Sequence, residues 1–132
     1  MKLEDQVCTK EQAKKLKELG VEQKGLFVHI NAKYSSSNIL LLENIHSMDL
    51  EEERFSAFTV AELGVMITSD KIIDWPVGVG YDNKDWHLFY TKNKYRDIDK
   101  SKHEAYIRAA MLIYLLENNY TTSEEVNKRL YA

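Results

Sequence analysis

Histidine is the residue type in this chain best able to ligate a metal or transfer a proton near neutral pH. The four histidines are His29, His46, His87 and His103. No two of them are four residues apart, and none belongs to a His-Glu-x-x-His or cysteine-rich motif, so their spacing indicates no metal site. His29 and His87 are both expected on strands, where a hydrogen-bonded or solvated histidine is the ordinary case. If those strands pair, the two histidines would approach each other. Either histidine with a nearby aspartate would suit a small hydrolase or transferase.

The other candidate nucleophiles and acids have simpler interpretations. Cys8 precedes a predicted helix start, which would lower the pKa of its thiol. A nucleophilic role would also need a base and an oxyanion site, and the sequence identifies neither. Ser35–Ser37 lack a nucleophile-elbow pattern and predict a turn. Asp74, Asp82 and Asp85 surround two tryptophans, and we assign them to turns and caps. The sequence therefore identifies no catalytic, cofactor-binding or metal-ligating residue and implies no cofactor.

Aromatic residues are concentrated between positions 75 and 95, and these are Trp75, Tyr81, Trp86, Tyr90 and Tyr95. Tryptophan and tyrosine are frequent anchors of protein interfaces, although they also pack ordinary sheets. We predict that four of them, Trp75, Tyr81, Trp86 and Tyr90, form a surface that binds a partner protein.

The net charge of −3 is unevenly distributed. Six of the seven charged residues between positions 43 and 62 are acidic, whereas residues 92–102 contain five cations, namely Lys92, Lys94, Arg96, Lys100 and Lys102. The simplest interpretation is two solvated loops of opposite charge. An acidic chain is a poor general binder of nucleic acid, but a local basic segment can contact phosphates by itself. A nucleic-acid-associated regulator that uses these five cations is therefore the alternative function.

Three capping boxes predict where helices begin. In each one a threonine stands three residues before Glu or Gln, and the boxes are Thr9–Gln12, Thr59–Glu62 and Thr122–Glu125. The threonine hydroxyl and the later side chain satisfy backbone N–H groups that a helix start leaves unpaired. The boxes predict helices over residues 9–19, 59–67 and 122–131, and Gly20 should end the first.

Runs of β-forming residues predict two hairpins. The first pairs residues 26–31, as a half-buried strand, with residues 39–42. The second pairs residues 77–81 with residues 86–91 across a turn rich in Asp and Asn. Strand alternation places Trp86, Leu88 and Tyr90 on one face, and His87, Phe89 and Thr91 on the other.

The longest helix is predicted over residues 102–118, and it has two apolar faces. One face carries Ala105, Ala109, Leu112 and Leu116, and the nearly opposite face carries Ile107, Met111 and Tyr114. A helix that is apolar nearly all round must be covered on more than one side. One face should pack on the sheet. The other should meet the last helix or a second copy of the chain, in a homodimer through Ile107, Met111 and Tyr114.

The chain of 132 residues fits one domain. We expect a single α+β domain over residues 1–132, with an antiparallel sheet of about four strands made from the two hairpins. The long helix should pack on this sheet, with smaller capping helices around it. No apolar run approaches the ~20 residues of a membrane span, and the N-terminus lacks the apolar segment of a secretory signal. Together with the single cysteine, these features predict a cytoplasmic protein without membrane association.

Three stretches resemble, in their order and spacing, a family of small uncharacterised proteins encoded in bacterial phages and prophages. They are Gln6–Thr9 with Glu11–Val21, Phe58–Gly64 and Ala110–Asn118. The chain departs from the family at Val28–His29, where aromatic residues are expected. The resemblance implies a location in the bacterial host cell but carries over no catalytic or ligand residue.

The sequence thus favours a phage- or prophage-associated accessory protein that acts without catalysis by binding an unidentified host or phage protein. The nucleic-acid regulator and the small histidine-dependent hydrolase or transferase are the two alternatives.

Overall fold

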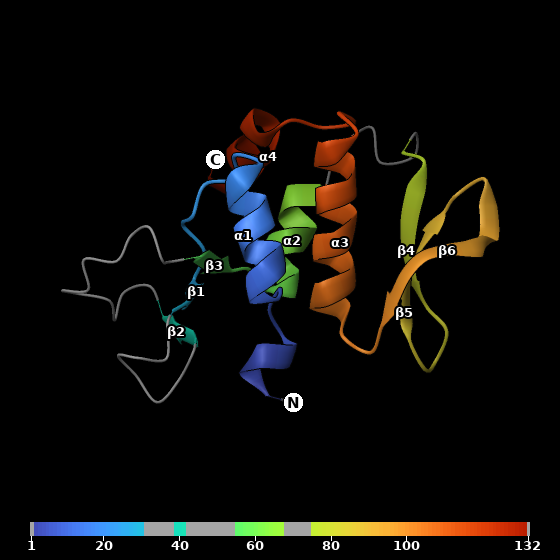
Figure 1. Ribbon diagram of the computed structural model, residues 1–132, viewed down its shortest axis with the longest axis horizontal. Helices are drawn as coiled ribbons and strands as arrows, with labels where there is room; N and C mark the ends of the chain where they lie inside the picture. The colour runs from blue at the N-terminus through green and yellow to red at the C-terminus, as the bar shows by residue number, and fades with distance from the viewer. Residues whose placement is uncertain (1, 31–38, 42–54, 68–74, 132) are drawn as a thin grey trace.

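The computed structural model describes residues 2–30, 39–41, 55–67 and 75–131. Within these residues the chain forms four α-helices, one short 3-10 helix and two three-stranded antiparallel sheets (Figure 1). In chain order the elements are η1 (Leu3–Asp5), α1 (Lys10–Glu18), β1 (Phe27–His29), β2 (Ile39–Leu41), β3 (Phe55–Ala57), α2 (Val60–Ile67), β4 (Val77–Tyr81), β5 (Trp86–Tyr90), β6 (Asn93–Ser101), α3 (Glu104–Glu117) and α4 (Ser123–Tyr131). The fold is therefore α+β, as the sequence predicts.

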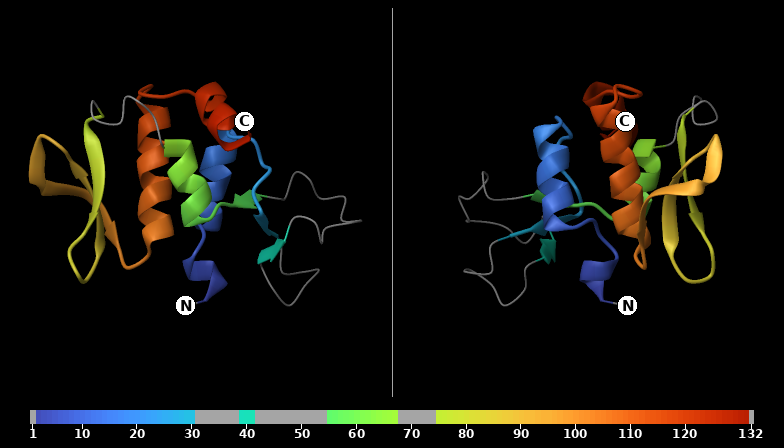
Figure 2. Two further views of the ribbon diagram at one scale, coloured as in Figure 1. Left: turned by 180° about the vertical axis from the view of Figure 1, so that it is seen from behind. Right: turned by 45° about the vertical axis from the view of Figure 1, so that its right-hand side comes forward.

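The helices form a middle layer, with one sheet on each side of it (Figure 1, Figure 2). The strand orders are β2–β1–β3 and β4–β5–β6. Helix α3 contacts α1 and α2, and it also contacts all three strands of the β4–β6 sheet. The prediction of one sheet of about four strands is wrong, because the helices lie between the two hairpins and each hairpin gains a third strand of its own.

Helix α1 begins and ends with the predicted motifs. At its start the Gln12 N–H donates to Thr9 Oγ1 at 3.1 Å, and the Thr9 N–H donates to Gln12 Oε1 at 3.1 Å. At its end Gly20 adopts a φ of 98°, and the Val21 N–H donates to the Leu16 carbonyl at 3.0 Å. This is a Schellman motif, and it satisfies carbonyls that the helix end would leave unpaired.

The other helix ends follow the same rules, except that one side chain at the start of α4 has a different hydrogen-bond partner. At α2, Thr59 and Glu62 form the predicted reciprocal box, with hydrogen bonds of 3.0 and 3.2 Å. At α4 only half of the box forms, because the Glu125 carboxylate accepts from the hydroxyl of Thr121, at 3.1 Å. Helix α3 ends in a second Schellman motif, with Asn119 at a φ of 61°.

The β1–β3 sheet contains the predicted first hairpin, since β1 pairs with β2 in antiparallel register. The predicted turn at residues 34–38 and the acidic stretch at residues 49–53 lie outside the described residues. Strand β3, which the sequence did not predict, pairs with the other edge of β1. The prediction of a half-buried strand is wrong, because Val28, His29 and Ile30 are all buried. As the central strand, β1 is covered on both faces.

The β4–β6 sheet contains the second hairpin almost as predicted. Strands β4 and β5 pair from Val77↔Tyr90 to Tyr81↔Trp86. Strand β6 occupies the basic segment, so the prediction of a solvated loop there is wrong. Ile98 in this segment packs against the core, and backbone pairing with β5 orders the charged residues around it.

Both apolar faces of α3 are covered within one chain. Ile107 is fully buried, and Met111 is 4% exposed. Of the three residues predicted to form a homodimer contact, Ile107 and Met111 are buried within one chain, which leaves only the half-buried Tyr114 open to a second copy. The last helix covers neither face substantially, since α4 packs mainly on α2, where Arg129 Nη1 donates to the Met66 carbonyl at 2.6 Å.

Replacing Gly20 should destabilise the fold, because Gly20 combines a left-handed conformation with close contact to α4. A Cβ atom there would lie 2.8 Å from Ser123 Oγ. We expect Gly20→Ala to lower the free energy of unfolding by at least about 1–2 kcal/mol in urea denaturation. The matched control is Asn119→Gly, which keeps the left-handed conformation at the other Schellman motif and should change stability by less than about 0.5 kcal/mol. Equal effects of the two substitutions would contradict this account.

Candidate partner-binding site

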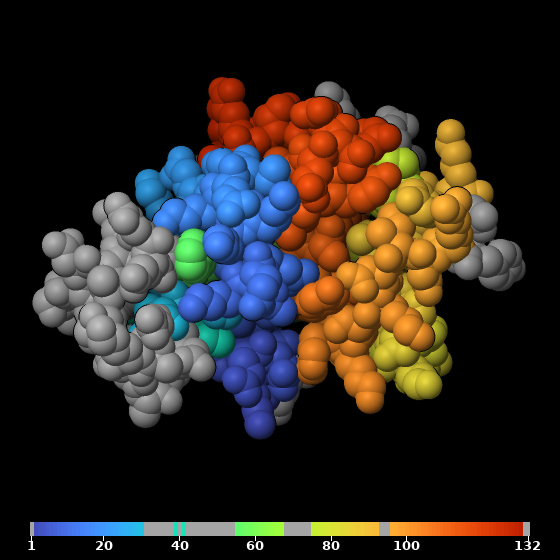
Figure 3. Space-filling model, viewed as in Figure 1, coloured from blue at the N-terminus to red at the C-terminus, as the bar shows by residue number. Residues whose placement is uncertain are grey.

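A cleft of about 560 Å³ opens where both sheets meet the starts of two helices. It is bounded by η1, by Phe27 of β1, by Thr59–Ala61 at the start of α2, by Trp86 of β5 and by Lys102–Glu104 at the start of α3. Figure 3 shows a hollow between the dark-blue N-terminal segment and the orange residues where β6 joins α3. We call it the Trp86 cleft.

Apolar side chains supply most of the cleft wall. They are Leu3, Phe27, Val60, Ala61 and Trp86. The Trp86 ring is held by the Tyr81 ring at 5.1 Å, and by the Arg108 guanidinium at 5.9 Å. Glu104 fixes Arg108 in turn through a 2.8 Å hydrogen bond. The indole is thus positioned before any partner arrives, which reduces the entropy cost of binding.

The polar residues of the cleft come from three places, namely Asp5 and Gln6 near the N-terminus, Thr59 before α2, and Lys102, His103 and Glu104 at the start of α3. Lys102 is exposed and makes no ion pair with any described residue. His103 Nε2 lies 3.6 Å from Asp5 Oδ1 of η1. No side-chain hydrogen bond caps α3, so the positive end of its dipole faces the same region. The carboxylates of Asp5 and Glu104 also line the cleft but are already paired with His103 and Arg108, so Lys102 is the charged group left to meet a negatively charged partner.

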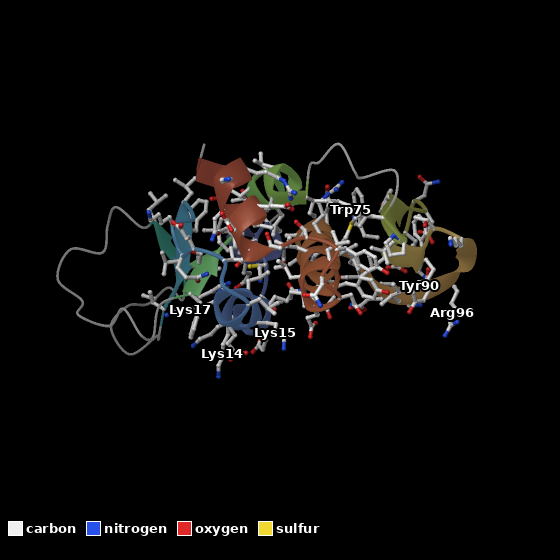
Figure 4. The ribbon with its side chains drawn as sticks, turned by 90° about the horizontal axis from the view of Figure 1, so that it is seen from above. Lys14, Lys15, Lys17, Trp75, Tyr90 and Arg96 are labelled. Carbon is white, nitrogen blue, oxygen red and sulfur yellow. The ribbon has the colours of Figure 1, made fainter. Side chains whose placement is uncertain are left out.

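The four predicted partner-binding aromatics separate into three environments. Trp75 is only 4% exposed and belongs to the core, so it is not a surface residue. Tyr81, which is 54% exposed, and Trp86 form a pair beside the cleft. Tyr90 lies at the far end of β5. Figure 4 shows Trp75 inside the molecule, whereas Arg96 projects from the sheet.

Tyr90 belongs to a second aromatic group that the sequence did not reveal. Its ring lies 6.4 Å from that of Tyr114, which in turn lies 6.4 Å from that of Tyr120. The Arg96 guanidinium covers the Tyr90 ring at 5.3 Å. Tyr114 and Tyr120 are near in sequence, but no local pattern shows that they meet β5.

The five basic residues do not share one surface. Lys100 lies opposite His87 in the β5–β6 register, on the sheet face away from α3, whereas the Arg96 guanidinium lies over the Tyr90 ring. Lys102 lines the Trp86 cleft, and Lys92 lies in the turn at the other end of β6. The side chain of Lys94 lies outside the described residues. Regular alternation would place Arg96 and Lys100 on the same face, but the β5–β6 register shifts on both sides of Phe89 and breaks that alternation.

Two of the candidate reactive side chains, those of Cys8 and His29, are buried, and burial favours the neutral form of each. Burial raises the pKa of the Cys8 thiol to about 12, which overrides any lowering by the nearby helix start. Burial also lowers the pKa of His29, whose Nε2 donates to the Cys8 carbonyl at 2.7 Å. His29 and His87 lie in different sheets on opposite sides of the helices (Figure 1), so they do not form a joint site.

His87 lies between two carboxylates on the outer face of the β4–β6 sheet. Its Nε2 is 2.7 Å from Asp82 Oδ2, and its Nδ1 is 2.8 Å from Asp97 Oδ2. These hydrogen bonds raise the pKa of His87. The N–H of Asp85, the His87 ring and the N–H of Lys84 lower the pKa of Asp82 to about 2. Both ring nitrogens are engaged, so His87 offers no accessible base to a substrate.

None of the helices in the described part of the chain combines the length and apolar character that a membrane span requires. Among residues 2–30, 39–41, 55–67 and 75–131, no group of three or more histidine, cysteine or carboxylate side chains is arranged to hold a metal ion.

The Trp86 cleft also explains why the sequence alone did not identify a complete site. Its wall residues come from segments separated by tens of positions, and Leu3, Phe27 and Ala61 carry no motif. Comparison with known proteins adds no relative: no family model matches the chain, and no curated protein or solved structure is significantly similar to it.

Proposed function

We propose that this protein is a non-enzymatic accessory protein that binds a segment of another protein in the Trp86 cleft. The observation that carries the proposal is the cleft itself, where a pre-positioned tryptophan, other apolar side chains and an unpaired lysine converge. Apolar clefts with a few polar groups accept the anchor side chains that dominate the affinity of protein interfaces.

The chemistry of the cleft defines its occupant. Trp86, Phe27 and Val60 favour a large apolar side chain, since its burial removes apolar surface from water. Lys102 and the uncapped start of α3 favour a carboxylate beside that side chain. The partner segment should therefore present an aromatic or large aliphatic residue next to an aspartate or glutamate.

The association with phages or prophages is the second part of the proposal. It is supported by the three stretches that resemble the phage and prophage family, which contribute to α1, α2 and α3 of the helical layer. On this basis the partner is a host or phage protein in the cytoplasm of the bacterial cell.

The two alternatives have weaker support. A nucleic-acid regulator would need the basic residues on one surface, and β6 divides Lys100 from Arg96. A histidine-dependent hydrolase or transferase would need an accessible base, and both nitrogens of His87 are already bonded.

Filling the cleft should abolish partner binding without disturbing the core. Ala61 is exposed on α2 and lines the cleft, whereas Val65, one turn later, is 44% exposed and does not line it. In affinity capture from infected or prophage-carrying cells, we expect Ala61→Phe to lose the partner and Val65→Phe to retain it. With the captured segment as a synthetic peptide, Trp86→Ala should weaken binding by about 2 kcal/mol, roughly thirty-fold. Retention of the partner by Ala61→Phe would disprove binding in the cleft.

Charge reversal should separate a cleft contact from general electrostatics. Lys102→Glu and Lys92→Glu change the net charge equally, but only Lys102 lines the cleft. We expect Lys102→Glu to weaken peptide binding by about 1 kcal/mol, roughly five-fold, and Lys92→Glu to have no such effect. Isothermal titration calorimetry measures both. Equal losses would contradict a specific carboxylate contact, and salt-sensitive binding of single- or double-stranded DNA by the wild type would favour the nucleic-acid alternative.

A further inference from the structure

We propose that His87 is a proton-operated latch that fastens β6 to the turn between β4 and β5. Asp82 lies in that turn, directly after Tyr81, and Asp97 lies on β6. The His87 ring bridges the two carboxylates across the outer face of the sheet.

The number of available hydrogens makes the latch depend on a proton. A carboxylate can only accept, so both ring nitrogens of His87 must carry hydrogen for both contacts to form. Only the imidazolium has two N–H groups. A neutral ring donates from one nitrogen only. The lone pair of its other nitrogen then points at a carboxylate oxygen, which it repels. The side chain is 20% exposed, so the proton can exchange with solvent.

Asp97 is the carboxylate that the neutral ring releases. Asp82 is held independently, because its Oδ1 also accepts from the N–H groups of Lys84 and Asp85, at 2.9 and 2.8 Å. The Asp97 carboxylate has no further hydrogen bond among the described residues. The β5–β6 register also shifts on both sides of Phe89, the residue opposite Asp97, so pairing is weakest there.

Among the charged groups around His87, the two aspartates have the largest effect on its protonation. On β6 Lys100 lies opposite His87, and on β4 the opposite residue is Gly80. The turn contributes Asp82, Lys84 and Asp85, and α3 lies against the other face of the sheet. The two carboxylates at hydrogen-bond distance outweigh the more distant lysine, which agrees with the raised pKa of His87.

Loss of the His87–Asp97 contact also affects the surface formed by Arg96 and Tyr90. Arg96 is adjacent to Asp97 and covers the Tyr90 ring. Release of Asp97 removes a hydrogen bond that holds this part of β6, so the position of Arg96 over the Tyr90 ring becomes dependent on pH. The stabilising effect is complete below the pKa of an unfolded histidine, near 6.5, and is lost as the pH rises through the higher pKa of the folded state.

NMR spectroscopy of the isolated protein tests the latch without any partner. We expect the His87 ring to titrate above the midpoint of a free histidine and to become the Nε2–H tautomer at high pH. Over the same range, hydrogen-exchange protection factors at residues 97–99 should fall at least several-fold. They are compared after correction for the intrinsic pH dependence of exchange.

Two substitutions make the test decisive. In Asp97→Asn the amide can donate to a neutral ring nitrogen, so the His87 midpoint should fall and protection should no longer depend on the His87 titration. Asp85→Asn removes a nearby charge that does not contact the ring, and it should change neither. The latch is disproved if His87 titrates like a free histidine, or if its titration leaves the protection of β6 unchanged.

The titration of Asp82 at acid pH provides a separate test of the same cluster. Asp82 has a pKa of about 2, below the 3.8 of a free aspartate, so its contribution is present above pH 3.8 and is lost as the pH falls towards 2. The carboxyl carbon chemical shift of Asp82 should therefore titrate near pH 2, and in His87→Gln the midpoint should move upwards. An unchanged midpoint would show that His87 does not bond to Asp82 in solution.

Discussion

A helix with two apolar faces cannot lie on the surface of a protein in water, and α3 is such a helix. Each exposed large aliphatic side chain would forgo about 1.5–3 kcal/mol of transfer free energy, so both faces of α3 must be covered. Ile107, Leu112 and Leu115 are fully buried. Helices α1 and α2 and the β4–β6 sheet provide the cover. The positions of α1, α2 and the β4–β6 sheet follow from this requirement.

The Trp86 cleft is a consequence of the same arrangement. Where α2 and α3 begin, the helical layer ends, and the turns that lead into these helices cannot pack as closely as the helices themselves. The N-terminal helix η1 closes one side, and the tip of the β4–β5 hairpin brings Tyr81 and Trp86 to the other. A helix start also concentrates positive partial charge. The junction therefore joins an apolar wall to a rim where Lys102 and the uncapped start of α3 lie beside the already paired carboxylates of Asp5 and Glu104. This combination suits a protein segment with an apolar and an acidic residue.

Burial and partner geometry, rather than residue type, decide which side chains can respond to protons. Cys8 and His29 lie in the interior, where desolvation favours their neutral forms. His87 lies on an outer face between Asp82 and Asp97, where hydrogen bonds to two carboxylates favour its charged form. Residues of the same type, His29 and His87, thus have pKa values displaced in opposite directions. The difference arises from the location of each strand in the molecule.

Local interactions were predictable from the sequence, because they join residues a few positions apart. The Thr9 box, the Gly20 stop and the β4–β5 hairpin are set by neighbours within about five residues, as is the helical span of α3. Long-range assembly was not predictable, because residue pairing across the sheets depends on the whole chain. Only the tertiary structure placed β3 beside β1, turned the basic segment into β6 and removed Trp75 from the surface. The local sequence determined the helix ends and the β4–β5 hairpin, because those contacts join near neighbours. The burial of apolar faces against one another determined how the elements pack, and therefore where the clefts and side-chain clusters between them lie.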